Sequence, residues 1–199
     1  MPVDVTLIVT DVPPLITLAA AGRLDYLLYP GLPVIIPDAV FYEATRQTDR
    51  LGAQEILDWY HAHDSVVRVE PTEVFKNEII RLTTQGGRLE RNLGERAAVE
   101  VIRDWKLADE QRAILISDDR DMGRIVVIDP TQIILLTTWD FLRQLEEGQR
   151  IQSADAVMQA ARDAGRHPPT RGLWDHHAAD IQDAIRAVIA RAHGTDEVP

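Results

Sequence analysis

Four acidic residues that are far apart in the sequence stand at the ends of predicted strands or near the starts of predicted helices. They are Asp11, Glu43, Glu95 and Asp119. Carboxylates gathered in one place repel one another, and a divalent cation removes that repulsion. Mg²⁺ and Mn²⁺ prefer oxygen ligands and keep several waters, and one or two such ions promote hydrolysis of a phosphodiester. The pattern therefore predicts a metal-assisted hydrolytic site.

Each acid, taken alone, also has a structural interpretation. Asp11 can cap the helix that follows it, and Glu95 can stabilise the start of its own helix through the helix dipole. The acidic turn after residue 116 can be an ordinary polar turn, and its Asp118 and Asp121 are alternatives to Asp119. Helix geometry favours Glu95 over the acid five residues later, because that spacing turns the two side chains about 140° apart.

Predicted strands alternate with predicted helices along residues 5–147. The strands are predicted at residues 5–10, 33–36, 65–69, 113–116 and 133–136, and the helices at residues 15–21, 39–47, 52–63, 72–85, 95–106 and 138–147, with a short helical turn at 23–28. Asp38 is the predicted N-cap of the second helix. Strands that are apolar on both faces indicate a parallel sheet covered by helices on both sides, and such sheets bind ligands beyond the carboxyl ends of their strands. Asp11 and Asp119 lie at such ends.

After residue 147 the predicted pattern changes from alternating strands and helices to helices alone. An alanine-rich helix is predicted at residues 153–164, a linker at 166–172 and an amphipathic helix at 175–193. We therefore expect a catalytic α/β domain over residues 1–150 and a helical extension over residues 151–199.

The composition of the chain excludes several classes of protein. The chain has 199 residues, 45% of them hydrophobic, a net charge of −11 and no cysteine. The missing cysteines exclude disulfides and thiolate zinc sites and fit a reducing cytosol, so we expect a cytoplasmic protein. No basic residues precede the apolar stretch 15–21, and no apolar run reaches the roughly 18 residues of a membrane span, so neither a secretion signal nor a membrane anchor is expected.

A local excess of basic residues interrupts this acidic chain. Residues 76–106 hold seven basic residues against five acidic ones. Arg88, Arg91 and Arg96 lead into the predicted helix of Glu95 and are candidates for phosphate contacts. The alternative is a solvated helix face with i,i+4 ion pairs. The four tryptophans lie in apolar helical contexts and are predicted to be core residues rather than base-stacking platforms.

Four stretches resemble, in order and spacing, the motifs of PIN-domain nucleases. Residues 8–28 (IVTDVPPLITLAAAGRLDYLL) resemble the opening motif, residues 34–43 (VIIPDAVFYE) the second acidic motif, residues 92–98 (NLGERAA) the Gly-Glu helix start, and residues 114–121 (ILISDDRD) the Ser/Thr-x-Asp motif. The resemblance implies a Rossmann-like three-layer fold and Mg²⁺- or Mn²⁺-dependent cleavage, usually of RNA. Many members are toxins of bacterial toxin–antitoxin pairs, so a single-stranded RNA substrate, an antitoxin partner and a homodimer are implied.

The acidic positions of the family fall on Asp11, Glu43, Glu95 and Asp119, which the resemblance makes metal-binding and catalytic residues. Its hydroxyl position falls on Ser117. One departure stands out, since the family has a pair of small hydroxyl residues where this chain has Val12-Pro13. Such hydroxyls orient neighbouring carboxylates. The alternative is therefore a catalytically weakened PIN-like domain that serves as a binding or regulatory module, with its C-terminal helices as the interface.

Overall fold

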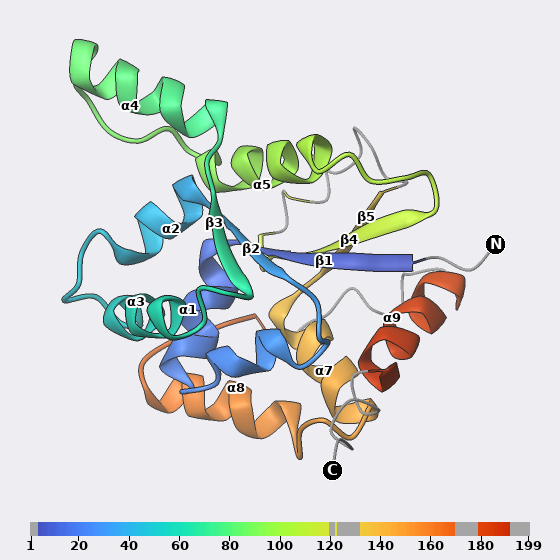
Figure 1. The fold of residues 1–199 in the computed structure, drawn as a ribbon. Helices are drawn as coiled ribbons and strands as arrows, with labels where there is room; N and C mark the ends of the chain where they lie inside the picture. Colours follow the sequence, from blue (N-terminus) through green and yellow to red (C-terminus); the bar gives the residue numbers. More distant parts are fainter. Residues whose placement is uncertain (1–3, 120–121, 123–131, 170–178, 192–199) are drawn as a thin grey trace.

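The computed structural model of the chain describes residues 4–119, 122, 132–169 and 179–191. The described strands form one five-stranded sheet with the order β3-β2-β1-β4-β5, in which every neighbouring pair is parallel (Figure 1). The strands are β1 (Asp4–Thr10), β2 (Val34–Pro37), β3 (Val67–Glu70), β4 (Gln111–Ile116) and β5 (Ile133–Leu136). The predicted parallel sheet is thereby confirmed. Its order places β1 in the centre, with β2 and β4 on either side.

The described helices follow the predicted ones to within a few residues at their ends. They are α1 (Val12–Ala20), the 3-10 helix η1 (Leu24–Leu28), α2 (Asp38–Thr45), α3 (Ala53–Ala62), α4 (Glu73–Gln85), α5 (Leu93–Asp104), α7 (Thr138–Glu147), α8 (Ala154–Asp163) and α9 (Ala179–Arg191). The N-cap prediction for Asp38 is wrong, because β2 runs directly into α2 and Pro37 takes the cap position. The Asp38 carboxylate instead accepts hydrogen bonds from the backbone N–H (3.0 Å) and the hydroxyl (2.7 Å) of Thr72, which precedes α4.

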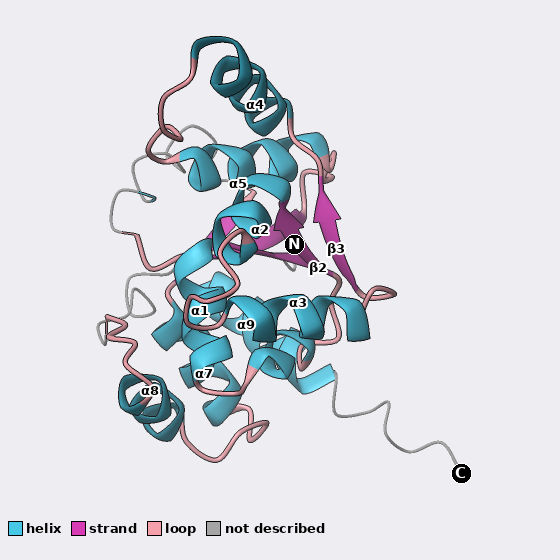
Figure 2. Cartoon of the chain, turned by 90° about the vertical axis from the view of Figure 1, so that its left-hand side faces the viewer, coloured by secondary structure: helices cyan, strands magenta, loops and turns pink. Residues whose placement is uncertain are grey.

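Alternate residues of the strands pack into two separate cores, as a sheet covered on both faces requires. On one face Ile8, Ile36 and Ile114 join the buried sides of α1, α7 and α9. On the other face Leu7, Val9 and Leu115 pack against α5. Figure 2 shows the resulting three layers, with α4 and α5 on one side of the sheet and the remaining helices mostly on the other. This packing fixes the sheet's carboxyl edge, at which the predicted acids lie.

The two C-terminal helices pack on the body of the protein. Helix α8 contacts α1 and α7, and α9 contacts α7 and β1. Ile185 and Ile189 of α9 are buried in the main core. At Gly148 a Cβ atom would come within 2.5 Å of Ile189, so the missing side chain lets α9 approach the end of α7. The division into residues 1–150 and 151–199 stays a prediction.

Some predicted features fall partly or wholly outside the described residues. These are Asp121, Trp174, the second half of the predicted linker and both ends of the predicted last helix. Within the described part, Trp59 is buried, and Trp105 and Trp139 pack partly buried against the cores. No helix of the described part is long and apolar enough to cross a membrane.

Helix α4 differs from the other helices in projecting from the body (Figure 1). Its only buried residue is a charged one, Glu78, and its Ile80 is 52% exposed. It contacts α5 and begins at Thr72, whose hydroxyl accepts a hydrogen bond from the Phe75 N–H as an N-cap. An arm held by so little apolar burial depends on polar contacts for its position.

Candidate active site

A cleft of about 880 Å³ opens where the chain leaves β1 and β4 at the carboxyl edge of the sheet. All four predicted acids line it, together with other residues of α1, α2, α5 and the α4–α5 connection. The lining residues are Asp11, Val12, Pro13, Tyr42, Glu43, Arg46, Leu82, Gly87, Arg88, Leu89, Glu90, Arg91, Asn92, Leu93, Gly94, Glu95 and Asp119. We call Asp11, Glu95 and Asp119 the acidic floor, and residues 86–92 the basic rim.

Asp11 is the most buried acid of the cleft, with 3% of its surface exposed. Its backbone N–H donates to the Ile116 carbonyl (3.0 Å), which continues the pairing of β1 and β4 into the cleft. One carboxylate oxygen caps α1 by accepting from the Val12 N–H (2.7 Å), and the other accepts from the Ser117 hydroxyl (2.9 Å). Ser117 thus gives Asp11 a hydroxyl partner although Val12-Pro13 provides none.

The pKa of Asp11 is raised to about 6, chiefly by burial and less by the negative charges of Glu43 and Asp119. The hydrogen bonds from Val12 and Ser117 act in the opposite direction and lower the pKa. The raised pKa means that the ionised carboxylate lacks enough compensating positive charge in the protein alone. A cation placed in the cleft would supply that charge.

Glu95 reaches the cleft from the first turn of α5, whose start is brought close to Asp11 by a glycine. Helix α5 begins at Leu93, two residues before the predicted start, after Asn92 in the left-handed region (φ 58°). A Cβ on Gly94 would lie 3.1 Å from Asp11 Oδ1 and 3.2 Å from Val40 Cγ2. The pKa of Glu95 is raised to about 7, chiefly by burial and less by the charges of Asp11 and Asp119.

The two described acids in the turn after β4, Asp118 and Asp119, have different roles. Asp119 lines the cleft, and its backbone N–H donates to the Ser117 hydroxyl (3.2 Å). Asp118 instead accepts from the backbone N–H (2.8 Å) and hydroxyl (2.9 Å) of Thr138 at the start of α7, and burial raises its pKa. The structure therefore places Asp119, and not Asp118, in the cleft, while Asp121 lies outside the described residues.

Two further glutamates lie on the neighbouring helices α2 and α5 and have different positions. Glu43 is exposed on α2 and lines the same cleft as the floor. Glu100, in contrast, is buried on α5 and accepts from the N–H groups of Glu73 (2.7 Å) and Val74 (3.0 Å), so it caps the start of α4. Helix geometry predicted that the side chain of Glu100 points away from that of Glu95, and the structure confirms this.

The predicted arginines also separate into two groups. Arg88 and Arg91 line the cleft, whereas Arg96 forms an ion pair with Glu90 (2.7 Å) and does not line it. Arg46, the residue that follows α2, lines the cleft too, and no motif pointed to it. Within the described ranges, no carboxylate forms an ion pair with Arg46, Arg88 or Arg91.

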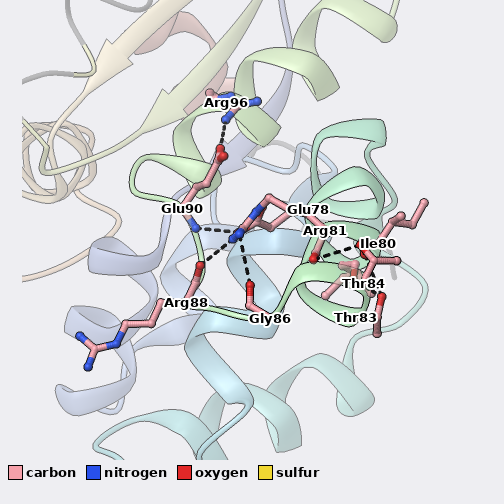
Figure 3. A network of polar contacts seen from close by, with 10 residues as sticks. Glu78, Ile80, Arg81, Thr83, Thr84, Gly86, Arg88, Glu90 and Arg96 are labelled. Carbon is pink, nitrogen blue, oxygen red and sulfur yellow. Dashed lines mark hydrogen bonds and ion pairs between the residues drawn. The ribbon is translucent and has the colours of Figure 1, made fainter.

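One ion pair holds the basic rim against α4 (Figure 3). Arg81 donates from Nε (2.6 Å) and Nη2 (2.7 Å) to the buried carboxylate of Glu78, and this bidentate contact lowers the Glu78 pKa to about 2. The Arg81 guanidinium also donates to the carbonyls of Gly86 (3.4 Å) and Arg88 (2.6 Å), and Glu78 accepts from the Glu90 N–H (2.7 Å). The pair thereby fixes the backbone on both sides of Arg88.

The donor set of the floor fits a hard divalent cation. Among the residues that the structure describes, no three acidic or histidine side chains are close enough together to enclose an ion. Mg²⁺ does not need such a cage, because it keeps several waters and binds through one or two carboxylates. The raised pKa values of Asp11 and Glu95, and the close approach of the α5 start to Asp11 that Gly94 permits, are consistent with a site that binds such an ion.

The fold and the cleft define an α/β protein with an acidic site at the carboxyl edge of a parallel sheet. A family model described as a PIN domain matches residues 7–169, which is most of the chain and includes all four acids. The chain therefore belongs to the PIN-domain family, whose members are generally nucleases and typically use divalent metals. No curated protein matches the chain significantly.

Proposed function

We propose that this protein is a Mg²⁺- or Mn²⁺-dependent ribonuclease that hydrolyses phosphodiester bonds in single-stranded RNA. The observation that carries the proposal is the position of Asp11, which is buried, has a raised pKa and shares one cleft with the three other predicted acids. Membership of the PIN-domain family supports the nuclease class. Arg46, Arg88 and Arg91 of the cleft, which form no ion pair with a described carboxylate, support a phosphate-bearing substrate.

Each group of residues has its own task in this proposal. Asp11, Glu95 and Asp119 would hold the ion, and Glu43, which lines the same cleft, would orient a water. Ser117 fixes the Asp11 carboxylate through its hydrogen bond (2.9 Å). Arg88 and Arg91 contact phosphates of the substrate. When bound, the divalent ion supplies Lewis-acid chemistry that polarises the phosphoryl group and activates water.

The biological setting is a separate proposal that depends on the family resemblance. We propose a cytoplasmic toxin of a toxin–antitoxin pair, active as a homodimer and inhibited by an antitoxin protein. Sedimentation of the purified chain tests the dimer. Induced expression that stops growth in the wild type but not in the Asp11→Asn variant tests the toxin.

The nuclease proposal is tested by cleavage of a single-stranded RNA with Mn²⁺. We expect Asp11→Asn to lower kcat by about a hundredfold or more, because the metal contributes several kcal/mol to transition-state stabilisation. Asp109→Asn makes the same charge change at an exposed residue outside the cleft and should leave the rate unchanged.

Two outcomes would contradict the assignment. Equal rates for the wild type and Asp11→Asn would show that the acidic floor is not the catalytic site. Binding of RNA by the wild type without turnover and without Mn²⁺ binding would favour the alternative of a binding module. Titration calorimetry with Mn²⁺ separates the nuclease from this alternative, since only the nuclease is expected to bind the metal.

A further inference from the structure

The cleft holds an exposed aromatic ring that no motif accounts for. Among the described residues, the large hydrophobic side chains with substantial exposure are Tyr42, Leu51, Val66 and Ile80. Of these only Tyr42, which is 39% exposed, lines the cleft. Exposed aromatic surface beside a polar site is costly in water and is often retained for a ligand.

The ring is held in place by its neighbours and does not need to be ordered by a ligand. Phe75 of α4 packs against it, with ring centroids 5.3 Å apart and an interplanar angle of 47°. Phe75 is itself partly buried against the small core that joins α2, α4 and α5. The ring therefore loses little further conformational entropy when a flat ligand stacks on it.

Positively charged side chains share the cleft with this ring. The guanidinium of Arg46, the residue that follows α2, lies over the ring at 5.8 Å from its centroid and has no ion-pair partner in the described part of the chain. Arg88 and Arg91 line the same cleft on the basic rim. Tyr42 lines the same cleft as the acids, so a ligand on the ring would share that cleft with them. A preformed aromatic surface flanked by cations is how proteins bind single strands, by stacking bases and contacting phosphates.

We infer that Tyr42 is a base-stacking subsite for single-stranded nucleic acid, with Arg46 holding an adjacent phosphate. The inference rests on the proposed nuclease function and adds to it a cause of strand selectivity. A base must leave its duplex to cover the ring, so the subsite favours unpaired strands. Stacking uses the face that every base has, so the subsite does not select sequence.

The test is binding of a fluorescein-labelled 12-nucleotide RNA, measured by anisotropy with the full chain in EDTA so that no cleavage occurs. We expect Tyr42→Ala to weaken binding by roughly 5- to 150-fold, the range for losing one stacked base. Tyr42→Phe keeps the ring and should bind within about twofold of the wild type. Ile80→Ala, an exposed apolar residue outside the cleft, is the matched control and should bind like the wild type.

A second measurement reports stacking directly. RNA carrying 2-aminopurine should change its fluorescence on binding to the wild type and Tyr42→Phe, and much less with Tyr42→Ala. The duplex of the same sequence should bind the wild type and Tyr42→Ala equally weakly.

Wild-type affinity in Tyr42→Ala, or a loss in Tyr42→Phe equal to that in Tyr42→Ala, would overturn the inference. The Mn²⁺-dependent cleavage assay distinguishes the two proposals. If the wild type cleaves RNA and Tyr42→Ala binds RNA with normal affinity, the nuclease proposal stands and the stacking subsite is contradicted. If the wild type neither binds nor cleaves RNA, both proposals are contradicted.

Discussion

The acidic floor and the basic rim face the same cleft but are held in different ways. Asp11 of the floor continues the hydrogen bonding of β1 and β4, and the strands below it are buried on both faces. The rim has less apolar support, which comes from Leu89 packed against a small core, and one polar pair, Glu78 with Arg81, fixes its backbone. Because core packing holds the acidic floor in place, the floor's geometry depends on the whole fold. The rim depends on a few contacts that single substitutions can remove.

This difference separates the expected consequences of substitution. A change in the floor should affect metal binding and turnover, with the rim still able to bind substrate. A change in the rim should weaken substrate binding, with metal affinity retained. The predictions below test that separation.

Of the changes considered below, Ser117→Ala, which removes a hydrogen-bond partner of the floor residue Asp11, should have the largest effect on metal affinity. The variant removes the hydrogen bond (2.9 Å) that orients the Asp11 carboxylate. Loss of such a partner typically lowers metal affinity about 10- to 100-fold, and we expect that loss for Mn²⁺ in titration calorimetry. The control is Ser153→Ala, which removes the N-cap of α8 at a distance from the cleft. It should cost about 1 kcal/mol of stability and leave Mn²⁺ affinity unchanged. Equal Mn²⁺ affinities of wild type and Ser117→Ala would contradict the account.

Stability should depend on pH through the floor. Burial raises the pKa of Asp11 to about 6 in the folded protein, whereas in the unfolded chain the group ionises near its ordinary value of 3.8. Between these values the folded state binds more protons, so the metal-free protein loses stability as pH rises through this window. The loss should be about 3 kcal/mol. Glu95 adds less than its pKa suggests, because it is partly exposed and screened by solvent.

Urea unfolding in EDTA at pH 4 and pH 7 measures this dependence. Asp11→Asn carries no charge in either state, so the difference between wild type and variant should shrink at the lower pH. Mn²⁺ binds the ionised carboxylates, so its affinity should rise between pH 5 and pH 8. A wild-type stability that falls no more than that of Asp11→Asn would contradict the raised pKa.

A smaller effect is expected for Arg81→Lys in the rim. Lysine cannot make the bidentate contact with Glu78 and reach the carbonyls of Gly86 and Arg88 together. Displacement of Arg88 should raise KM for RNA by about tenfold and change kcat little, because positioning of substrate is what is lost. Arg103→Lys is the control, since Arg103 is exposed and paired only with Asp104. A fall in kcat at unchanged KM would show that the rim is not a separate unit.

The same contrast explains what the sequence could predict. Asp11 and Asp119 follow apolar strands, so their convergence at one sheet edge followed from the hydrophobic pattern and the rule for parallel sheets. Strand β5 and helix α7 have the predicted boundaries because a turn and a capping box separate them clearly. Helix α5 began two residues earlier than predicted, because Asn92 adopts a left-handed conformation that its sequence context did not indicate.

The rim could not be predicted in the same way. The contact of Arg81 with Glu78 has i,i+3 spacing and looks like any surface ion pair, yet the same guanidinium also binds carbonyls of the connection after α4. Tyr42 and Arg46 became candidates only when the fold placed their side of α2 along the cleft. Local pattern determines burial and strand ends, whereas polar contacts between separate segments depend on the finished fold.

The most direct test of the central claim is the anomalous diffraction of a crystal soaked in Mn²⁺. The account predicts a manganese peak in the cleft, beside the carboxylates of Asp11, Glu95 and Asp119, and its loss in crystals of Asp11→Asn. A peak that stays in Asp11→Asn, or manganese bound only outside the cleft in a protein that cleaves RNA, would contradict the account.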